Sequence, residues 1–158
     1  IEVCDWSSDV CSSDLLSNIA SIKIPGLPDD QAGVRVATLR QRLPQRVSIG
    51  VSGDAFAAAG LNGGCNLWYS VCAGLFPQIA QNITAAALIG ERQQASALSE
   101  QLEPLWALFR QHGSLKVIAA AASILELAEV ECLPRPLAPL STDAINDVKS
   151  VMDKLDLR

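Results

Sequence analysis

A lysine near the end of a predicted strand is the residue in this sequence best suited to covalent chemistry. Residues 18–24 read NIASIKI and alternate as a strand does, so Lys23 lies on the face opposite Ile22 and Ile24. In an apolar, partly dry site a lysine loses part of its preference for the charged form, and its amine becomes nucleophilic near neutral pH. Such an amine condenses with a ketone to give an imine, an electron sink for making or breaking the neighbouring carbon–carbon bond. The alternative interpretation is a strand-end lysine that extends into solvent.

Other residue types associated with catalysis or metal binding form no recognisable site. Ser52 lies in SGD and not in the G-x-S-x-G turn of serine hydrolases, and the Gly63-Gly64 pair lacks the G-x-G-x-x-G spacing of a phosphate loop. His112 is the only histidine, and its place at a predicted helix end favours a dipole interaction over a metal ligand. The glutamates after residue 125 have no histidine beside them. We therefore expect neither a metal nor a cofactor.

The elements that would position Lys23 alternate between strand and helix up to about residue 76. The patterns predict strands over residues 18–24, 47–52 and about 67–71. They predict helices over about 31–43, capped by Asp29 or Asp30, and about 54–61. This order, with short connections, indicates consecutive parallel βα units and therefore an α/β fold.

The two clearest strands each have one bulky face and one face with small or polar residues. In the second strand the bulky face carries Val47, Ile49 and Val51, and the other face carries Ser48, Gly50 and Ser52. A parallel strand that is buried on both sides usually reads as a continuous apolar run. Small residues on one face leave room inside a βα barrel, whose pocket lies at the carboxyl ends of the strands. The pattern therefore predicts a pocket next to Lys23.

From Pro77 onward the sequence predicts helices only. We expect them over about residues 77–89, 91–112, 115–130 and 141–155, with glycines after the first two. Pro104 falls inside the second and should kink it, because proline cannot donate the helical hydrogen bond. Residues 133–140 (LPRPLAPL) should form an extended connection between helices, rather than a ligand for a partner that grips proline-rich peptides.

The composition is that of a globular, alanine-rich protein and argues against nucleic-acid and membrane partners. The chain is 49% hydrophobic and 18% charged, with a net charge of −5. It lacks a basic stripe, a basic amphipathic helix and any apolar run of the ~18 to 20 residues that span a bilayer. Cys65, Cys72 and Cys132 form neither a disulfide framework nor a metal-binding pair, so we expect all three to be buried. We expect a cytoplasmic protein.

Residues 1–15 are expected to be foreign to the protein. The segment from Asp5 to Leu15 reads DWSSDVCSSDL, which is the translation, in one frame, of a DNA adapter used for sequencing libraries. Native sequence would then start near Leu16, with a net charge close to −1 and three cysteines. The chain would be the tail of a longer protein, whose own start, including any leader peptide, lies upstream.

Three segments occur in an order that is typical of one enzyme family. Ile22-Lys23 is followed by Ser52-Gly53-Asp54 and then by residues 68–71 (WYSV) after a Gly-Gly pair. The segments ALIGERQQASALSEQLEPLWALF, SLKVIAAAASILEL and LPRPLAPLS extend the pattern. Over nearly all of residues 18–158 the chain thus resembles the dihydrodipicolinate synthase and N-acetylneuraminate lyase family of imine-forming aldolases.

The resemblance implies the C-terminal part of a (β/α)8 TIM barrel. Residues 16–76 would hold about strands six to eight, and residues 77–158 the last barrel helix and a three-helix extension. A complete barrel takes about 250 residues, so about five βα units would be missing, with the family's Thr-Thr loop and proton-relaying tyrosine. Lys23 would be the imine lysine. The residues left to contact the substrate would be Gly53, Asp54 and Ser70.

The sequence departs from the family pattern at several positions. Ile24 replaces the acid that often follows the lysine, and Ala55 replaces the second acid of the family's SGDD segment. Trp68 and Tyr69 are larger than the usual residues of the last strand, and one of them must face the helices because strand side chains alternate. These differences indicate a branch of the family with a different second substrate.

For the complete protein, the resemblance implies a lyase that acts on a pyruvate-type keto acid and an aldehyde-type substrate. It also implies a homo-oligomer, commonly a tetramer. The alternative is a non-catalytic barrel relative that binds a small metabolite or serves as an assembly subunit. We expect residues 16–158 alone to be inactive, because three strands of a closed barrel leave two strand edges and an apolar face uncovered.

Overall fold

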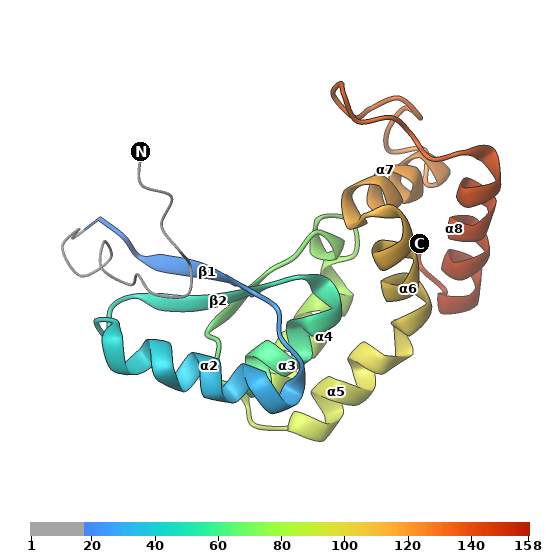
Figure 1. Ribbon diagram of the computed structural model, residues 1–158. Coiled ribbons are helices and arrows are strands. Elements are labelled where there is room, and N and C mark those ends of the chain that lie inside the picture. The colour runs from blue at the N-terminus through green and yellow to red at the C-terminus, as the bar shows by residue number, and fades with distance from the viewer. Residues whose placement is uncertain (1–17) are drawn as a thin grey trace.

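Short parallel strands and their connecting helices form the first part of the structure, and helices alone form the rest (Figure 1). The computed structural model describes residues 18–158. In chain order the elements are β1 (Ser21–Pro25), α2 (Asp29–Arg42), β2 (Ser48–Ser52), the 3-10 turn η1 (Asp54–Phe56), α3 (Ala57–Asn62), β3 (Leu67–Tyr69), the 3-10 turn η2 (Cys72–Gly74), α4 (Pro77–Leu88), α5 (Arg92–Gln101), α6 (Glu103–His112), α7 (Ser114–Ile124) and α8 (Thr142–Leu155). The predicted α/β class is confirmed.

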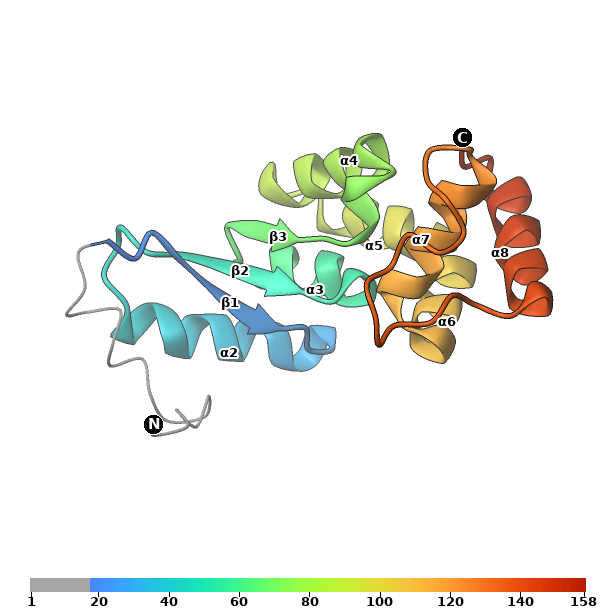
Figure 2. The ribbon, with the colours of Figure 1, turned by 90° about the horizontal axis from the view of Figure 1, so that it is seen from above.

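The strands form one parallel sheet in the order β1-β2-β3. β1 pairs with β2 so that Lys23 lies beside Gly50, and β2 pairs with β3 so that Ser52 lies beside Tyr69. Parallel neighbours require a crossover connection, which α2 and α3 provide. These two helices lie on one side of the sheet, and α4 follows beside β3 (Figures 1 and 2). One face of the sheet is therefore covered by helices.

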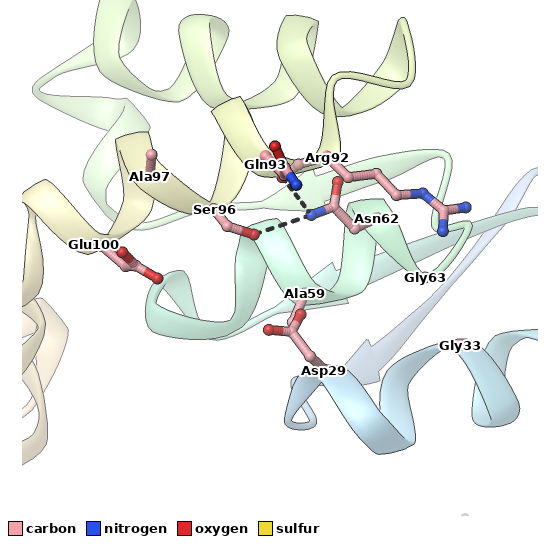
Figure 3. Close-up of a pocket in the computed structure, with 10 residues that line it drawn as sticks. All are labelled: Asp29, Gly33, Ala59, Asn62, Gly63, Arg92, Gln93, Ser96, Ala97 and Glu100. Carbon is pink, nitrogen blue, oxygen red and sulfur yellow. Dashed lines mark hydrogen bonds between the residues drawn. The ribbon is translucent and has the colours of Figure 1, made fainter.

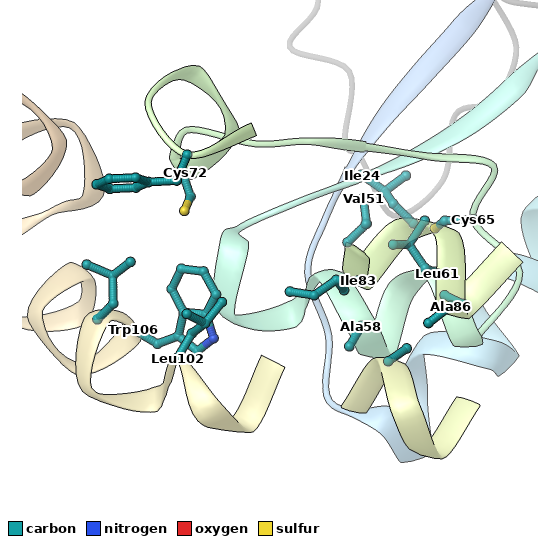
Figure 4. Close-up of a cluster of buried hydrophobic side chains, with 14 of the residues drawn as sticks. Ile24, Val51, Ala58, Leu61, Cys65, Cys72, Ile83, Ala86, Leu102 and Trp106 are labelled. Atoms are coloured by element: carbon teal, nitrogen blue, oxygen red, sulfur yellow. The ribbon is translucent and has the colours of Figure 1, made fainter. Parts of the chain in front are cut away.

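The bulky side chains of the strands pack against this helical layer. Ile24, Ile49 and Val51 are 6%, 0% and 1% exposed. Figure 4 shows Ile24 and Val51 in one group with Leu61 of α3 and Ile83 of α4. The alternation predicted for the two clear strands is thus confirmed, because their branched residues are buried under the helices.

The C-terminal helices differ from the prediction at Pro104. A single kinked helix over residues 91–112 was expected, and this is wrong, because α5 ends before Leu102 and α6 begins after it. Pro104 lies in the first turn of α6. Backbone N–H groups there have no partner within the helix, so a proline costs the helix no hydrogen bond. Trp106 joins the two helices, since it is 1% exposed and its indole N–H donates to the carbonyl of Ser99 at 3.0 Å.

The helix α7 is also shorter than predicted. α7 ends at Ile124 instead of near residue 130, and Glu126 has a φ of 58°, which a right-handed helix cannot continue through. Cys132 lies in the loop that follows and is exposed, so the expectation that it is buried is wrong. The connection over residues 133–140 is extended only in part, because it turns at Arg135-Pro136.

The N-terminal residues of α2 and α8 show how each of these helices is capped. Pro28 occupies the N-cap position of α2, and no side chain caps that helix, so the cap expected from Asp29 or Asp30 is wrong. Both aspartates lie in the first turn instead, where they favour the helix dipole. The last helix begins where it was predicted to, and Ser141 caps it by accepting a hydrogen bond from the backbone N–H of Ala144. Within residues 18–158, none of the helices is both long and apolar enough to cross a membrane.

Candidate active site

Lys23 lies on the face of the sheet that α2 and α3 leave uncovered. Its neighbour Ile24 points toward the helices and is buried, whereas Lys23 itself is exposed. The residue beside Lys23 on β2 is Gly50, which has no side chain to cover the lysine stem. Lys23 therefore projects from the face of the sheet that has no helical cover.

Tyr69 fills the place that a side chain at Gly50 would occupy. A Cβ added to Gly50 would lie 2.4 Å from Tyr69 Cε2 and 2.4 Å from Leu67 Cδ1, well inside van der Waals contact. The Tyr69 hydroxyl reaches β1, where its hydrogen bond with Ser21 Oγ is 2.5 Å long. The side chain of Tyr69 thus extends from β3 across β2 to β1, on the same face as Lys23.

Trp68 takes the opposite face of β3. It borders a groove together with Ala80, Thr84 and Leu88 of α4. Sequence alternation required one of Trp68 and Tyr69 to face the helices, and the structure assigns that position to Trp68. Sequence reasoning did not single out Tyr69 as a site residue. A signal was present in Gly50, the small residue on the neighbouring strand whose space the tyrosine ring fills.

Asp54 holds the carboxyl end of the sheet through a buried carboxylate. Its Oδ1 atom accepts hydrogen bonds from the backbone N–H groups of Val71 at 3.1 Å and Cys72 at 3.0 Å. Only 4% of Asp54 is exposed. Gly53 precedes it with a φ of 88°, a conformation that suits glycine and turns the chain out of β2 toward Asp54. The aspartate therefore fixes the segment that follows β3 onto the end of β2.

Ser70 completes this arrangement. Its hydroxyl donates to Asp54 Oδ1 at 2.6 Å and accepts from the backbone N–H of Ala73 at 2.8 Å. Nearby, Ser52 Oγ donates to the carbonyl oxygen of Ile24 at 3.0 Å and so joins the ends of β1 and β2. The structure thus brings Gly53, Asp54 and Ser70 together at the end of β2, and places Lys23 on the neighbouring strand.

The cysteines near the sheet are not suited to act as nucleophiles at neutral pH. Burial raises the pKa of Cys65 to about 11, and burial together with the charge of Asp54 raises the pKa of Cys72 to about 12. Both thiols therefore hold their protons. Their burial confirms the prediction for these two cysteines. Within the part of the chain that the structure describes, no group of three His, Cys, Asp or Glu side chains is arranged to hold a metal ion.

A separate pocket lies on the helical side, between α2, α3 and α5 (Figure 3). Its volume is about 510 Å³, and its polar lining includes Asp29, Asn62, Arg92 and Glu100. The Asn62 amide donates to the Arg92 carbonyl at 3.1 Å and to Ser96 Oγ at 3.2 Å, so it joins α3 to α5. None of the predicted site residues lines this pocket. Its position places it outside the site around Lys23.

Comparison with known proteins gives one consistent family. The model of the dihydrodipicolinate synthetase family matches residues 15–155. Among solved structures, a dihydrodipicolinate synthase from Agrobacterium tumefaciens is similar at 39% identity, with a TM-score of 0.81 over 87% of this chain and 46% of that one. The 4-hydroxy-tetrahydrodipicolinate synthase from Methylacidiphilum fumariolicum is similar at 27% identity, with a TM-score of 0.75 over 88% and 45%.

A more distant structure supports the same fold. The dihydrodipicolinate synthase from Thermotoga maritima has 21% identity and a TM-score of 0.80, over 90% of this chain and 48% of that one. The chain therefore spans about half the length of these solved structures. The search of curated proteins found no match.

Proposed function

Because the chain belongs to the dihydrodipicolinate synthetase family, a family of imine-forming aldolases, we propose that it is the C-terminal part of an enzyme that joins Lys23 to a 2-keto acid of the pyruvate type. The observation that carries this proposal is the position of Lys23. Lys23 lies on the uncovered face of a parallel sheet, beside a glycine and two residues before the carboxyl end of β1. Pockets of βα barrels lie at those ends.

We place the three strands as the last strands of an eight-stranded barrel, about strands six to eight. Residues 16–76 would carry these βα units, and residues 77–158 would carry the last barrel helix and a helical extension. Two observations support this placement. Within residues 18–158, β1 and β3 each pair on one side only, as strands do where a sheet is to be continued. The face that carries Lys23 has no helical cover, as expected of the inner face of a barrel.

The first step we propose is formation of the imine. The neutral Lys23 amine attacks the carbonyl carbon of the keto acid, its nitrogen forms the new bond, and the carbonyl oxygen leaves as water. The protonated imine withdraws electrons from the neighbouring carbon. Loss of a proton from that carbon gives an enamine. The uncovered face of β1 supplies the room for this adduct.

The second step forms the carbon–carbon bond. The enamine carbon attacks an aldehyde-type substrate, whose oxygen takes up a proton, and water then releases the product and restores the Lys23 amine. Residues of the preceding barrel units would relay these protons and hold the carboxylate of the keto acid. In the lyase direction the same steps run backward.

Gly53, Asp54 and Ser70 would form the border of the substrate pocket. The Asp54 carboxylate already accepts hydrogen bonds from Ser70 and from two backbone N–H groups. We therefore propose that Asp54 and Ser70 act mainly by fixing the loop after β3. Gly53 would contribute its backbone to substrate contacts, because a side chain there would require a strained φ.

We further propose that the complete enzyme works as a homo-oligomer and that this chain by itself has no turnover. A sheet of three strands cannot enclose the imine from all sides, so water would reach the reacting carbon. Purified residues 16–158 should therefore show no substrate-dependent reaction. Measurable turnover by this piece would contradict the proposal for the isolated chain.

The test is reduction of the imine by borohydride in the complete protein that contains this chain. With pyruvate present, we expect a mass increase on the peptide that carries Lys23, and none in K23R. The matched control is K149R, because Lys149 is an exposed lysine on α8, far along the chain from the site. A wild-type protein that is not trapped under these conditions would favour the non-catalytic alternative, a barrel relative that only binds a metabolite or assembles with partners.

A further inference from the structure

We propose that Tyr69 sets the depth of the pocket beside Lys23 and thereby restricts the keto acid to a short carbon chain. This inference rests on the proposed function, because it concerns the substrate of the same site. It assigns a specificity-determining role to Tyr69, which is larger than the residues usual in the last strand of the family.

The Tyr69 ring lies above the strand position next to Lys23. The ring occupies the space above Gly50, and Gly50 is the register partner of Lys23 on the neighbouring strand. Neighbouring strands are about 4.8 Å apart, so the ring lies about one strand spacing from the Lys23 backbone on the same face. A group bound to the lysine amine and turned toward the amino end of β1 would therefore meet the ring.

The position of the Tyr69 hydroxyl shows how far the ring extends toward the amino end of β1. Its partner Ser21 precedes Lys23 by two residues on the same face of β1. At about 3.3 Å per residue, Ser21 lies about 6 to 7 Å from Lys23 toward the amino end of the strand. A barrel pocket opens at the opposite, carboxyl end. The ring consequently forms a floor on the closed side of Lys23.

Several contacts hold this floor in place. The hydrogen bond to Ser21 fixes the outer end of the ring, and the ring fills the gap at Gly50 together with Leu67. Tyr69 still has 37% of its surface exposed, so one side of the ring is free to contact a ligand. A keto acid with a longer chain would have to displace a ring that is bonded at its far end. Fit of this kind distinguishes substrates by about tenfold or more for each misplaced methylene.

The experiment compares pyruvate with 2-oxopentanoate in the borohydride trapping of the complete protein. The measured quantity is the keto-acid concentration that gives half-maximal trapping at Lys23. The wild type should need at least about tenfold more 2-oxopentanoate than pyruvate. In Y69A and Y69L, which remove the ring, this ratio should fall by about tenfold. Y69F loses the bond to Ser21 but keeps the ring packed over Gly50 beside Leu67, and should keep most of the ratio.

W68F is the matched control, because Trp68 is adjacent in sequence but faces α4. It should leave the ratio unchanged. A wild type that traps both keto acids equally well would overturn the inference, and so would an unchanged ratio in both Y69A and Y69L. A wild type that traps neither keto acid would overturn the proposed function, and the inference with it.

Discussion

The carboxylate of Asp54 and the hydroxyl of Ser70 share a hydrogen bond of 2.6 Å across 16 positions of sequence. Asp54 follows β2 and Ser70 follows β3, so the bond joins the carboxyl ends of two neighbouring strands. The same carboxylate accepts from the N–H groups of Val71 and Cys72. One buried acid therefore determines the path of the chain at the edge where a substrate would enter.

Replacing Asp54 with asparagine should destabilise the protein. The amide oxygen would have to accept from the donors to Oδ1 without the negative charge, and the NH2 group would face the backbone N–H of Val71, which lies 3.4 Å from Oδ2. We expect the free energy of unfolding to fall by about 1 to 3 kcal/mol, the usual result when a buried hydrogen-bonding group loses its partner. Urea unfolding of the complete protein measures this. D147N, at an exposed aspartate in the middle of α8, should change it by no more than about 0.5 kcal/mol.

Replacing Gly50 with alanine should also destabilise the protein, for a steric reason. The new methyl group would overlap Tyr69 and Leu67, and overpacking of this kind costs about 1 to 3 kcal/mol. In G50A/Y69A only the overlap with Leu67 remains, so the cost of the methyl group should be smaller. A double-mutant cycle by urea unfolding measures this coupling. G74A is the control, because a Cβ at Gly74 meets nothing within 4 Å. Additive effects of G50A and Y69A would contradict the contact.

The cysteines should differ sharply in reactivity. At pH 7.5, iodoacetamide should modify Cys132, which is exposed, and spare Cys65 and Cys72, which are buried and protonated. Mass spectrometry of the peptides from folded protein checks this, with urea-unfolded protein as the control in which all three react. Rapid modification of Cys72 in the folded protein would contradict its burial.

The same two thiols should make the protein less stable at alkaline pH. Their pKa values are raised to about 11 and about 12 from an ordinary value of 9.0. Above pH 9 the unfolded chain loses these protons while the folded protein keeps them, so stability falls as the pH rises from about 9 toward 12. Urea unfolding at pH 8 and pH 10.5 measures the decrease. In C72S the decrease should be smaller, and in C132S it should be the same as in the wild type.

Pro104 should be nearly neutral to replacement by alanine. It lies in the first turn of α6, where proline breaks no helical hydrogen bond, so P104A should change the free energy of unfolding by less than about 1 kcal/mol. A proline inside a continuous helix would instead cost about 3 kcal/mol, and P104A would then stabilise the protein by a similar amount. Thermal unfolding of the two proteins distinguishes the cases.

The strands and their two faces could be predicted from the sequence because the information is local. Side chains alternate along a strand, so the positions of Ile24, Ile49 and Val51 already indicated a buried face, and Lys23 the other. The order of the segments around Lys23, Gly53 and Ser70 indicated the family, which the match over residues 15–155 confirms. The start of α8 near Ser141 was likewise predicted from neighbouring residues.

Only the tertiary structure decided the relations between distant segments. Alternation could not say whether Trp68 or Tyr69 faces the helices, because this depends on the space left by Gly50 on another strand. The bond between Asp54 and Ser70 depends on the register of β2 and β3, and the break at Leu102 on the packing of Trp106 against α5. The two faces of the strands around Lys23 were thus predictable from local pattern, whereas the positions of Tyr69, Asp54 and Ser70 relative to Lys23 follow from strand pairing.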